Sequence, residues 1–173
     1  RPVALNTLVA EHVAHAEHAM RVRHPEFEAT LRLQLADDVG EVTMEPQEIG
    51  RVLVNLVDNA LNATRQRAEA GTNGYAPTVT VSTRRTEDGV EVRVADNGPG
   101  LAPEVAAKVF EPFFTTKPTG EGTGLGLSLS HDIVAQGHGG TLEAESVDGE
   151  GAAFVVSLPA PRSEAGTPGR ASP

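Results

Sequence analysis

The sequence of 173 residues contains no cysteine and no tryptophan, and aromatic residues make up only 3% of it. The absence of cysteine excludes a disulfide framework, a thiolate metal site and a cysteine nucleophile. No apolar run approaches the roughly 18 residues that a membrane-spanning helix needs. Acidic residues outnumber basic ones by 24 to 14, which argues against binding to nucleic acid or to anionic membranes, because both require a basic surface. With 39% hydrophobic residues, the chain is nevertheless expected to fold around an aliphatic core.

Apolar residues recur along the chain with the periods of helices and strands. Helical spacing predicts helices over residues 2–23, 46–69, 102–109 and 125–136. Alternation and turn residues predict strands over residues 29–36, 78–84, 90–95, 141–146 and 152–158. The last four strands form two antiparallel hairpins, which favours an α+β fold over a doubly wound parallel sheet.

The long helix carries an unusual number of asparagines. Asn55, Asn59 and Asn62 lie opposite its apolar side, although asparagine is a mediocre helix former because its side chain competes for backbone hydrogen bonds. Two interpretations stay open from this helix alone. The side is either a solvated surface or a row of amides that holds a polar ligand or Mg²⁺, for which amide oxygens are suitable ligands.

A carboxylate and two glycines directly follow the strand at 90–95. Asp96 can accept a hydrogen bond there, and Gly98 and Gly100 allow a flat ligand to approach the backbone closely. A plain turn is the alternative, since Asn-Gly and Pro-Gly are turn dipeptides.

Two further segments lie between the predicted helix at 102–109 and the main part of the predicted helix at 125–136. Residues 110–117 (FEPFFTTK) combine an aromatic cluster with Lys117, which could reach a phosphate, although a surface loop with one hydrophobic plug would look similar. Residues 120–128 (GEGTGLGLS) place alternating glycines before the helix, where exposed backbone amides favour anions. This loop is neither a Walker A loop nor a Rossmann fingerprint, because neither spacing is present.

Taken together and in order, these segments resemble the catalytic, ATP-binding domain of sensor histidine kinases in the GHKL superfamily. Residues 48–64 look like the N box of that family, 96–100 like its G1 box, 110–117 like its F box and 122–128 like its G2 box. The resemblance implies a two-layer α/β sandwich, the Bergerat fold, with a mixed and mostly antiparallel sheet of about five strands and helices on one face.

The resemblance also implies roles for individual residues. Asn59 would hold Mg²⁺ with the phosphates of ATP, and Asp96 would accept a hydrogen bond from the adenine amino group. Phe110 would anchor a mobile lid over the site, and Lys117 would contact a phosphate. Gly98 and Gly100 would line the adenine side, and Gly122, Gly124 and Gly126 would cradle the phosphates. The remaining expected nucleotide contacts are Asn62, Thr116, Thr123, Leu125 and Leu127.

The residue one turn before Asn59 bears on the reaction. Family members that hydrolyse ATP have a glutamate base there, whereas this chain has Asn55. A neutral amide cannot take a proton from water, which fits phosphoryl transfer to a neutral imidazole. An anti-sigma-factor-type serine kinase, which usually keeps that glutamate, and a degenerate nucleotide-binding module are the alternatives. The family's tyrosine after this motif is missing, and we expect Tyr75 to supply the aromatic surface for adenine.

The substrate histidine of such a kinase is expected outside this chain. None of the six histidines lies in the His-Glu-x-x-Asn/Thr-Pro pattern of the family's phosphoacceptor. We therefore expect an upstream dimerisation hairpin, with residues 1–27 as the helix or linker leading from it, 28–159 as the catalytic domain and 160–173 as a disordered tail. The fragment is expected to be monomeric and cytoplasmic, the full protein to be a homodimer, and a response regulator receiver domain to take the phosphoryl group.

Overall fold

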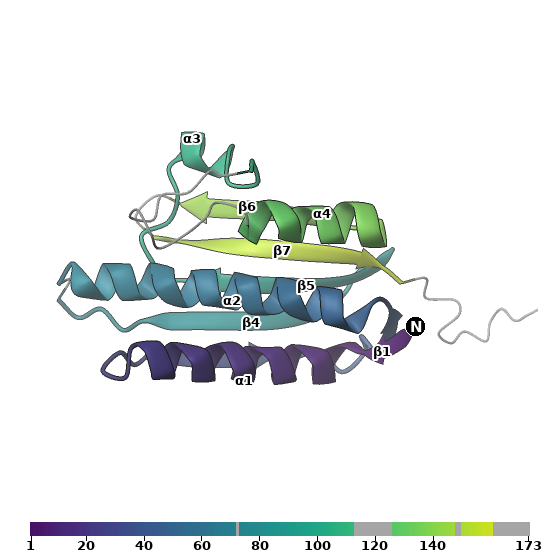
Figure 1. The fold of residues 1–173 in the computed structure, drawn as a ribbon, viewed down its shortest axis with the longest axis horizontal. Helices are drawn as coiled ribbons and strands as arrows, with labels where there is room; N and C mark the ends of the chain where they lie inside the picture. Colours follow the sequence, from purple (N-terminus) through teal and green to yellow (C-terminus); the bar gives the residue numbers. More distant parts are fainter. Residues whose placement is uncertain (72, 113–125, 148–149, 161–173) are drawn as a thin grey trace, which may run out of the picture.

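The computed structural model describes residues 1–71, 73–112, 126–147 and 150–160. Its helices are interspersed with single strands and pairs of consecutive strands, as Figure 1 shows. In chain order they are β1 (Pro2–Ala4), α1 (Leu5–Arg23), β2 (Thr30–Gln34), β3 (Glu41–Thr43), α2 (Pro46–Glu69), β4 (Thr78–Arg85), β5 (Gly89–Asp96), α3 (Pro103–Ala106), α4 (Gly126–His138), β6 (Thr141–Val147) and β7 (Gly151–Pro159).

The main sheet has five strands in the order β2-β4-β5-β7-β6. β2 runs parallel to β4, and the other neighbours pair antiparallel. Helices α1, α2 and α4 lie side by side over one face of this sheet (Figure 1). These features confirm the predicted α+β class and the two-layer sandwich with a mixed, mostly antiparallel sheet.

The core lies between this sheet and the helices. In β5 every second residue faces the helices, and the register places Val92 beside Val156 of β7 and Val94 beside Phe154. The apolar side of α2 covers them with Leu53, Leu56 and Val57 among its buried residues. Burial of this side of α2 leaves its asparagine-bearing side away from the core.

The first residues of the chain differ from the prediction. Residues 2–4 form β1, which pairs antiparallel with β3 as a separate two-stranded sheet, whereas we expected the first helix to begin at Pro2. Val3 pairs with Val42, and the amide of Met44 donates to the carbonyl of Arg1 at 2.9 Å. The local sequence carries no sign of this pairing because the partner strand lies about forty residues away.

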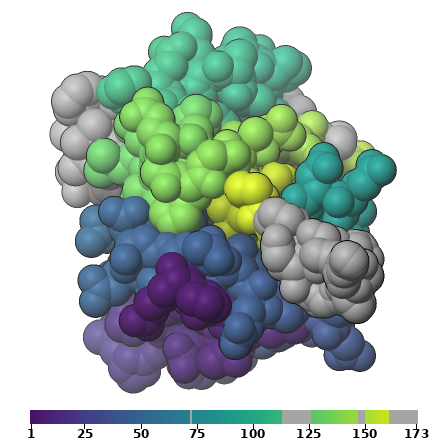
Figure 2. Space-filling model, turned by 90° about the vertical axis from the view of Figure 1, so that its right-hand side faces the viewer, coloured from purple at the N-terminus to yellow at the C-terminus, as the bar shows by residue number. Residues whose placement is uncertain are grey.

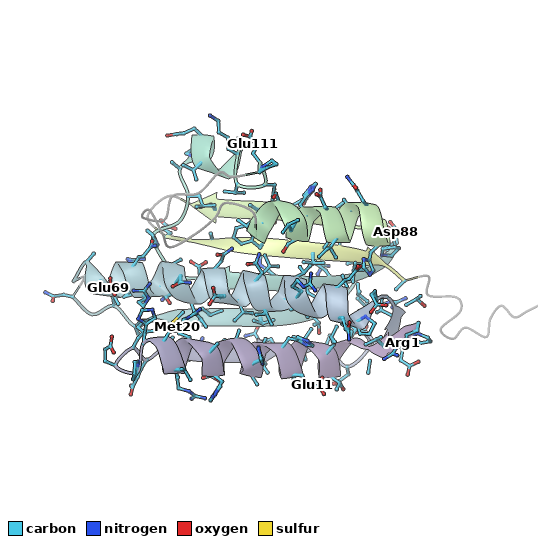
Figure 3. All side chains as sticks on the ribbon, in the orientation of Figure 1. Arg1, Glu11, Met20, Glu69, Asp88 and Glu111 are labelled. Atoms are coloured by element: carbon cyan, nitrogen blue, oxygen red, sulfur yellow. The ribbon has the colours of Figure 1, made fainter. Side chains whose placement is uncertain are left out.

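Helix α1 packs on α2 and shares its core (Figure 3, where Met20 points toward α2). Close packing is possible because Gly50 of α2 has no side chain where the His12 ring of α1 lies. The origin of this helix in an upstream hairpin, and the boundary after residue 27, stay predictions. Its buried residues are Leu5, Leu8, Val9, Val13, Ala16 and Met20.

Two other helices differ from their predicted lengths. α3 covers only Pro103–Ala106, and turns follow it where we expected the helix to continue to Val109. α4 extends to His138, two residues beyond the predicted end. It stops where Gly139 adopts a φ of 67°, a left-handed conformation that glycine tolerates. Figure 2 shows the end of α4 resting on the beginning of α2, where His138 Nε2 accepts a hydrogen bond from the amide of Glu45 at 3.1 Å.

Candidate functional site

The asparagine row lies on the half-buried side of α2, as predicted from its spacing. Asn55, Asn59 and Asn62 are all partly accessible, while four of the residues between them, Leu56, Val57, Ala60 and Leu61, are buried. The helix begins at Pro46, whose missing amide hydrogen costs nothing in a first turn, and the Glu45 side chain accepts a hydrogen bond from the amide of Gln47.

Asn55 forms a hydrogen bond between α2 and α4. Its Nδ2 donates to Oγ of Ser130, which is buried, at 3.1 Å. A Cβ added to Gly126 would lie 2.8 Å from Asn55 Oδ1, so the first turn of α4 leaves no room for a side chain there. The structure thus brings Asn55 together with Gly126, at the start of the helix that Leu127 continues.

Asn62 belongs to a series of linked polar side chains on the same side of α2. Its Nδ2 donates to the backbone oxygen of Asp58 at 3.1 Å, and its Oδ1 accepts from Arg65 Nη2 at 3.1 Å. Asp58 in turn forms an ion pair with Arg23 at the end of α1. Asn62 is therefore fixed by its neighbours.

Asp96 ends β5 with its carboxylate held by backbone amides. Oδ1 accepts a hydrogen bond from the amide of Gly98 at 2.8 Å. Burial raises the pKa of this carboxyl to about 6, although the amides of Gly98 and Ala152 act in the opposite direction by stabilising the charged form. At neutral pH Asp96 is thus an ionised acceptor in a partly desolvated position.

Gly98 is buried where the loop after β5 meets α2. A Cβ at this position would lie 2.9 Å from the Cβ of Ala63 and 2.9 Å from Asp96 Oδ1. Any side chain would therefore force the loop away from the helix. Gly100 is required for a different reason, because its φ of 77° lies in the left-handed region. The loop thus places Asp96 beside the asparagine-bearing half of α2.

Phe110 lies over α4 and the sheet. Its ring centroid is 5.2 Å from that of His131 and 6.1 Å from that of Phe154, the latter in an edge-to-face arrangement. Phe110 therefore fastens the chain to the core shortly before residue 113. The predicted contacts Thr116, Lys117, Gly122, Thr123, Gly124 and Leu125 lie outside the described residues.

Three residues support the loop after β5 beyond what the sequence indicated. Arg67, to which we assigned no role, donates from Nη1 to the backbone oxygens of Asn97 at 3.0 Å and Gly98 at 3.2 Å. Tyr75 donates its hydroxyl hydrogen to Asn97 Oδ1 at 3.1 Å. In the sequence, Asn97 is typical of an ordinary turn. Only its position directly after Asp96 could have indicated that it supports the site.

Comparisons with known proteins identify the family of this chain. The family described as "Histidine kinase-, DNA gyrase B-, and HSP90-like ATPase" matches residues 44–162. The sensor histidine kinase ZraS of Escherichia coli O157:H7 is 36% identical over 157 residues, which are 91% of this chain and 31% of ZraS. The two-component sensor PprA of Pseudomonas aeruginosa is 43% identical over 115 residues, 66% of this chain and 12% of PprA. The chain thus spans less than a third of these relatives.

Solved structures show the same fold. The catalytic domain of histidine kinase ThkA superimposes with a TM-score of 0.74 at 29% identity, covering 93% of this chain and 97% of that one. The mycobacterial sensor histidine kinase MprB gives a TM-score of 0.69 at 25% identity, covering 93% and 99%. Among the described residues, no helix is both long and apolar enough to cross a membrane.

The amide row on α2, the buried carboxylate after β5 and the family match lead to one assignment. The chain belongs to the family of histidine kinase-, DNA gyrase B- and HSP90-like ATPases, as an ATP-binding catalytic domain of the sensor histidine kinase type.

Proposed function

We propose that this domain binds Mg-ATP between α2 and the loop after β5 and transfers the γ-phosphoryl group to a histidine of another domain. One observation supports this most strongly. The ionised carboxylate of Asp96 and helix α2 meet at Gly98, which lies against Ala63, the residue after Asn62, and where a side chain would not fit. A carboxylate acceptor suits the base of a nucleotide, and a row of amides suits its phosphates with their bound Mg²⁺.

Asp96 would recognise the base. An ionised carboxylate accepts hydrogen bonds and donates none, so it favours the amino group of adenine over a carbonyl oxygen at the same position. Burial strengthens this selection because a mismatched base leaves the charge without a partner. Gly98 and Gly100 would lie along the edge of the base.

Asn59 would hold Mg²⁺ together with the phosphates. Its side chain offers one neutral oxygen, which suits a cation that takes most of its ligands from phosphate and water. Within the described part of the chain, no group of three or more histidine and acidic side chains could hold a metal by itself. The single amide oxygen of Asn59 suits an ion that is held mainly by the nucleotide and arrives with it. Bound Mg²⁺ would neutralise charge on the phosphates during transfer.

The reaction itself requires no base on this domain. The bond between the γ-phosphorus and the bridging oxygen breaks, a bond from a neutral imidazole nitrogen to phosphorus forms, and ADP leaves. Asn55 is a neutral amide, held by the bond from its Nδ2 to Ser130 Oγ, and an amide is too weak a base to take a proton from water. The domain would contribute positioning and charge stabilisation. Lys117 and the glycines of residues 122–126 are proposed to contact the phosphates.

The partners follow from this reaction. We expect the phosphoacceptor histidine on an upstream dimerisation hairpin, which makes the full protein a homodimer while this fragment stays monomeric. A response regulator receiver domain would then accept the phosphoryl group. Because its substrate ATP is cytosolic, the domain would act in the cytoplasm.

Phosphoryl transfer to the hairpin tests this proposal. The chain is mixed with ATP radiolabelled at the γ-phosphate and with a longer polypeptide of the same protein that carries the upstream hairpin. We expect label on the hairpin that is lost in acid and kept in base, as phosphohistidine is. Label on serine would instead favour the anti-sigma-factor-type kinase. ATP binding without transfer to any histidine would contradict the kinase proposal.

A further inference from the structure

The loop that follows Asp96 is held in place by three side chains, which we call the clasp. They belong to Arg67, Tyr75 and Asn97. The Asn97 side chain makes three hydrogen bonds. Its Oδ1 accepts from the amide of Thr78 at 2.9 Å and from the Tyr75 hydroxyl at 3.1 Å, and its Nδ2 donates to the carbonyl of Ala76 at 2.8 Å. Since a primary amide can make about four such bonds, Asn97 is nearly saturated and its orientation is fixed.

Arg67 closes the clasp from the last turn of α2. One guanidinium nitrogen donates to the backbone oxygens of both Asn97 and Gly98. The same guanidinium lies over the Tyr75 ring, 4.7 Å from its centroid, in a cation–π contact. Each member of the clasp therefore contacts the other two. The end of α2, the connection to β4 and the loop after β5 are tied together at one point.

The Tyr75 hydroxyl is suited to act as a donor in this arrangement. Burial raises the pKa of its phenol above the usual value, with Asp96 acting in the same direction and Arg67 opposing it. The phenol therefore keeps its hydrogen at neutral pH and can donate it to Asn97.

The clasp reaches Asp96 through one peptide unit. The amide of Gly98 donates to Asp96 Oδ1, and Arg67 holds the carbonyls on both sides of that amide. Gly98 also has no free space toward Ala63 of α2. A shift of the peptide between residues 97 and 98 would therefore move the donor that orients the carboxylate.

We propose that Arg67 and Tyr75 act through Asn97 as positioning residues for Asp96 and set how strongly the domain discriminates the amino group of adenine. The inference rests on the proposed function, in which Asp96 reads the base. It assigns Tyr75 a role through its hydroxyl group. Our sequence-based expectation assigned it a role through its ring, as an aromatic surface for adenine. The two roles differ in one substitution, because Tyr75→Phe keeps the ring and removes the hydroxyl.

The test compares two nucleotides that differ at the position read by Asp96. Dissociation constants for Mg-ATP and for Mg-inosine triphosphate, which has a carbonyl oxygen in place of the amino group, are measured by calorimetry. We expect the unmodified chain to prefer ATP. Tyr75→Phe and Arg67→Met should lower this preference by about five- to tenfold, mainly through weaker ATP binding, as loss of one hydrogen bond to a positioned charge allows.

Matched controls come from the other end of the β4–β5 hairpin, near Asp88, which Figure 3 places far from Glu69. Arg67 lies in the last turn of α2, which ends at Glu69. Thr86→Val removes a hydroxyl that accepts from the amide of Gly89, and Arg84→Met removes a guanidinium paired with Glu91. Both should leave the nucleotide preference unchanged. In an Asp96→Asn background, Tyr75→Phe should change the preference no further.

The outcomes separate the two proposals. If the unmodified chain binds both nucleotides equally, Asp96 does not read the base and the proposed function fails with the inference. If the chain prefers ATP and Tyr75→Phe keeps that preference, the clasp is only structural and the inference is overturned. Equal weakening of both nucleotides would overturn it as well. Tyr75→Phe removes a single oxygen atom, so it decides the question even if Arg67→Met does not fold.

Discussion

At the scale of single residues, Asp96 is the carboxyl group in the described part of the chain whose pKa burial clearly raises. Its carboxylate is largely desolvated and is compensated by backbone amides rather than by a positive side chain, so its pKa rises to about 6. Such a position costs folding free energy at neutral pH. It provides an acceptor that water does not fully satisfy, which a base-reading site requires.

We expect Asp96→Asn to stabilise the domain at neutral pH. Because the folded-state pKa of the carboxyl is raised from 3.8 to about 6, the stability gained from its neutral form is fully present below about pH 4 and is lost as the pH rises through about 6. A shift of about two pKa units corresponds to at most about 3 kcal/mol. Urea unfolding should therefore show Asp96→Asn to be about 1–3 kcal/mol more stable than the unmodified chain at about pH 7.5.

The comparison at low pH serves as the control for this substitution. At about pH 4 both side chains are neutral, and the two proteins should unfold with nearly equal free energies. A lower stability of Asp96→Asn at neutral pH would show that the amide contacts outweigh the burial of the charge.

At the scale of helices and strands, the sequence predicted most of the fold because the periodic patterns are local. The apolar stripe of α2 and the alternation of buried and accessible residues in β5 each arise because one side of the element is buried against the core. The pairing of Val3 with Val42 in the β1–β3 ribbon was not predictable, because nothing near Pro2 indicates a distant partner. The contacts of Arg67 and Tyr75 with Asn97 were missed for the same reason, since these residues lie 30 and 22 positions away from Asn97 in the sequence.

The contact between α1 and α2 can be tested at Gly50. Alanine normally stabilises a helix interior by about 1 kcal/mol relative to glycine. Here its Cβ would overlap the His12 ring, whose Nδ1 donates a hydrogen bond to the backbone oxygen of Leu8 at 2.8 Å. We therefore expect Gly50→Ala to lower the free energy of unfolding by about 1–2 kcal/mol, measured by urea titration.

Removing the obstructing ring provides the matched control. Adding His12→Ala to Gly50→Ala should restore part of the lost stability, because the new methyl group then has room. If Gly50→Ala alone is more stable than the unmodified chain, the close packing of α1 on α2 described here is incorrect.

At the scale of the whole molecule, one core in the described part of the chain joins α1, α2 and α4 to the five-stranded sheet, while the chain carries a formal charge of −10. An acidic protein repels a triphosphate at long range, so nucleotide binding must depend on local groups. Mg²⁺, backbone amides and the few nearby cations can supply that attraction without a basic surface. The net negative charge therefore argues more strongly against nucleic acid than against ATP as a ligand.

The most direct test of the account is a calorimetric titration of Mg-ATP into this chain and into Asp96→Asn at neutral pH. The account predicts saturable binding at one site for the unmodified chain. It predicts at least about tenfold weaker binding for Asp96→Asn, because a charge-assisted hydrogen bond to the base is lost. Equal affinity of the two proteins, or no binding by the unmodified chain, would contradict the assignment of this site to ATP.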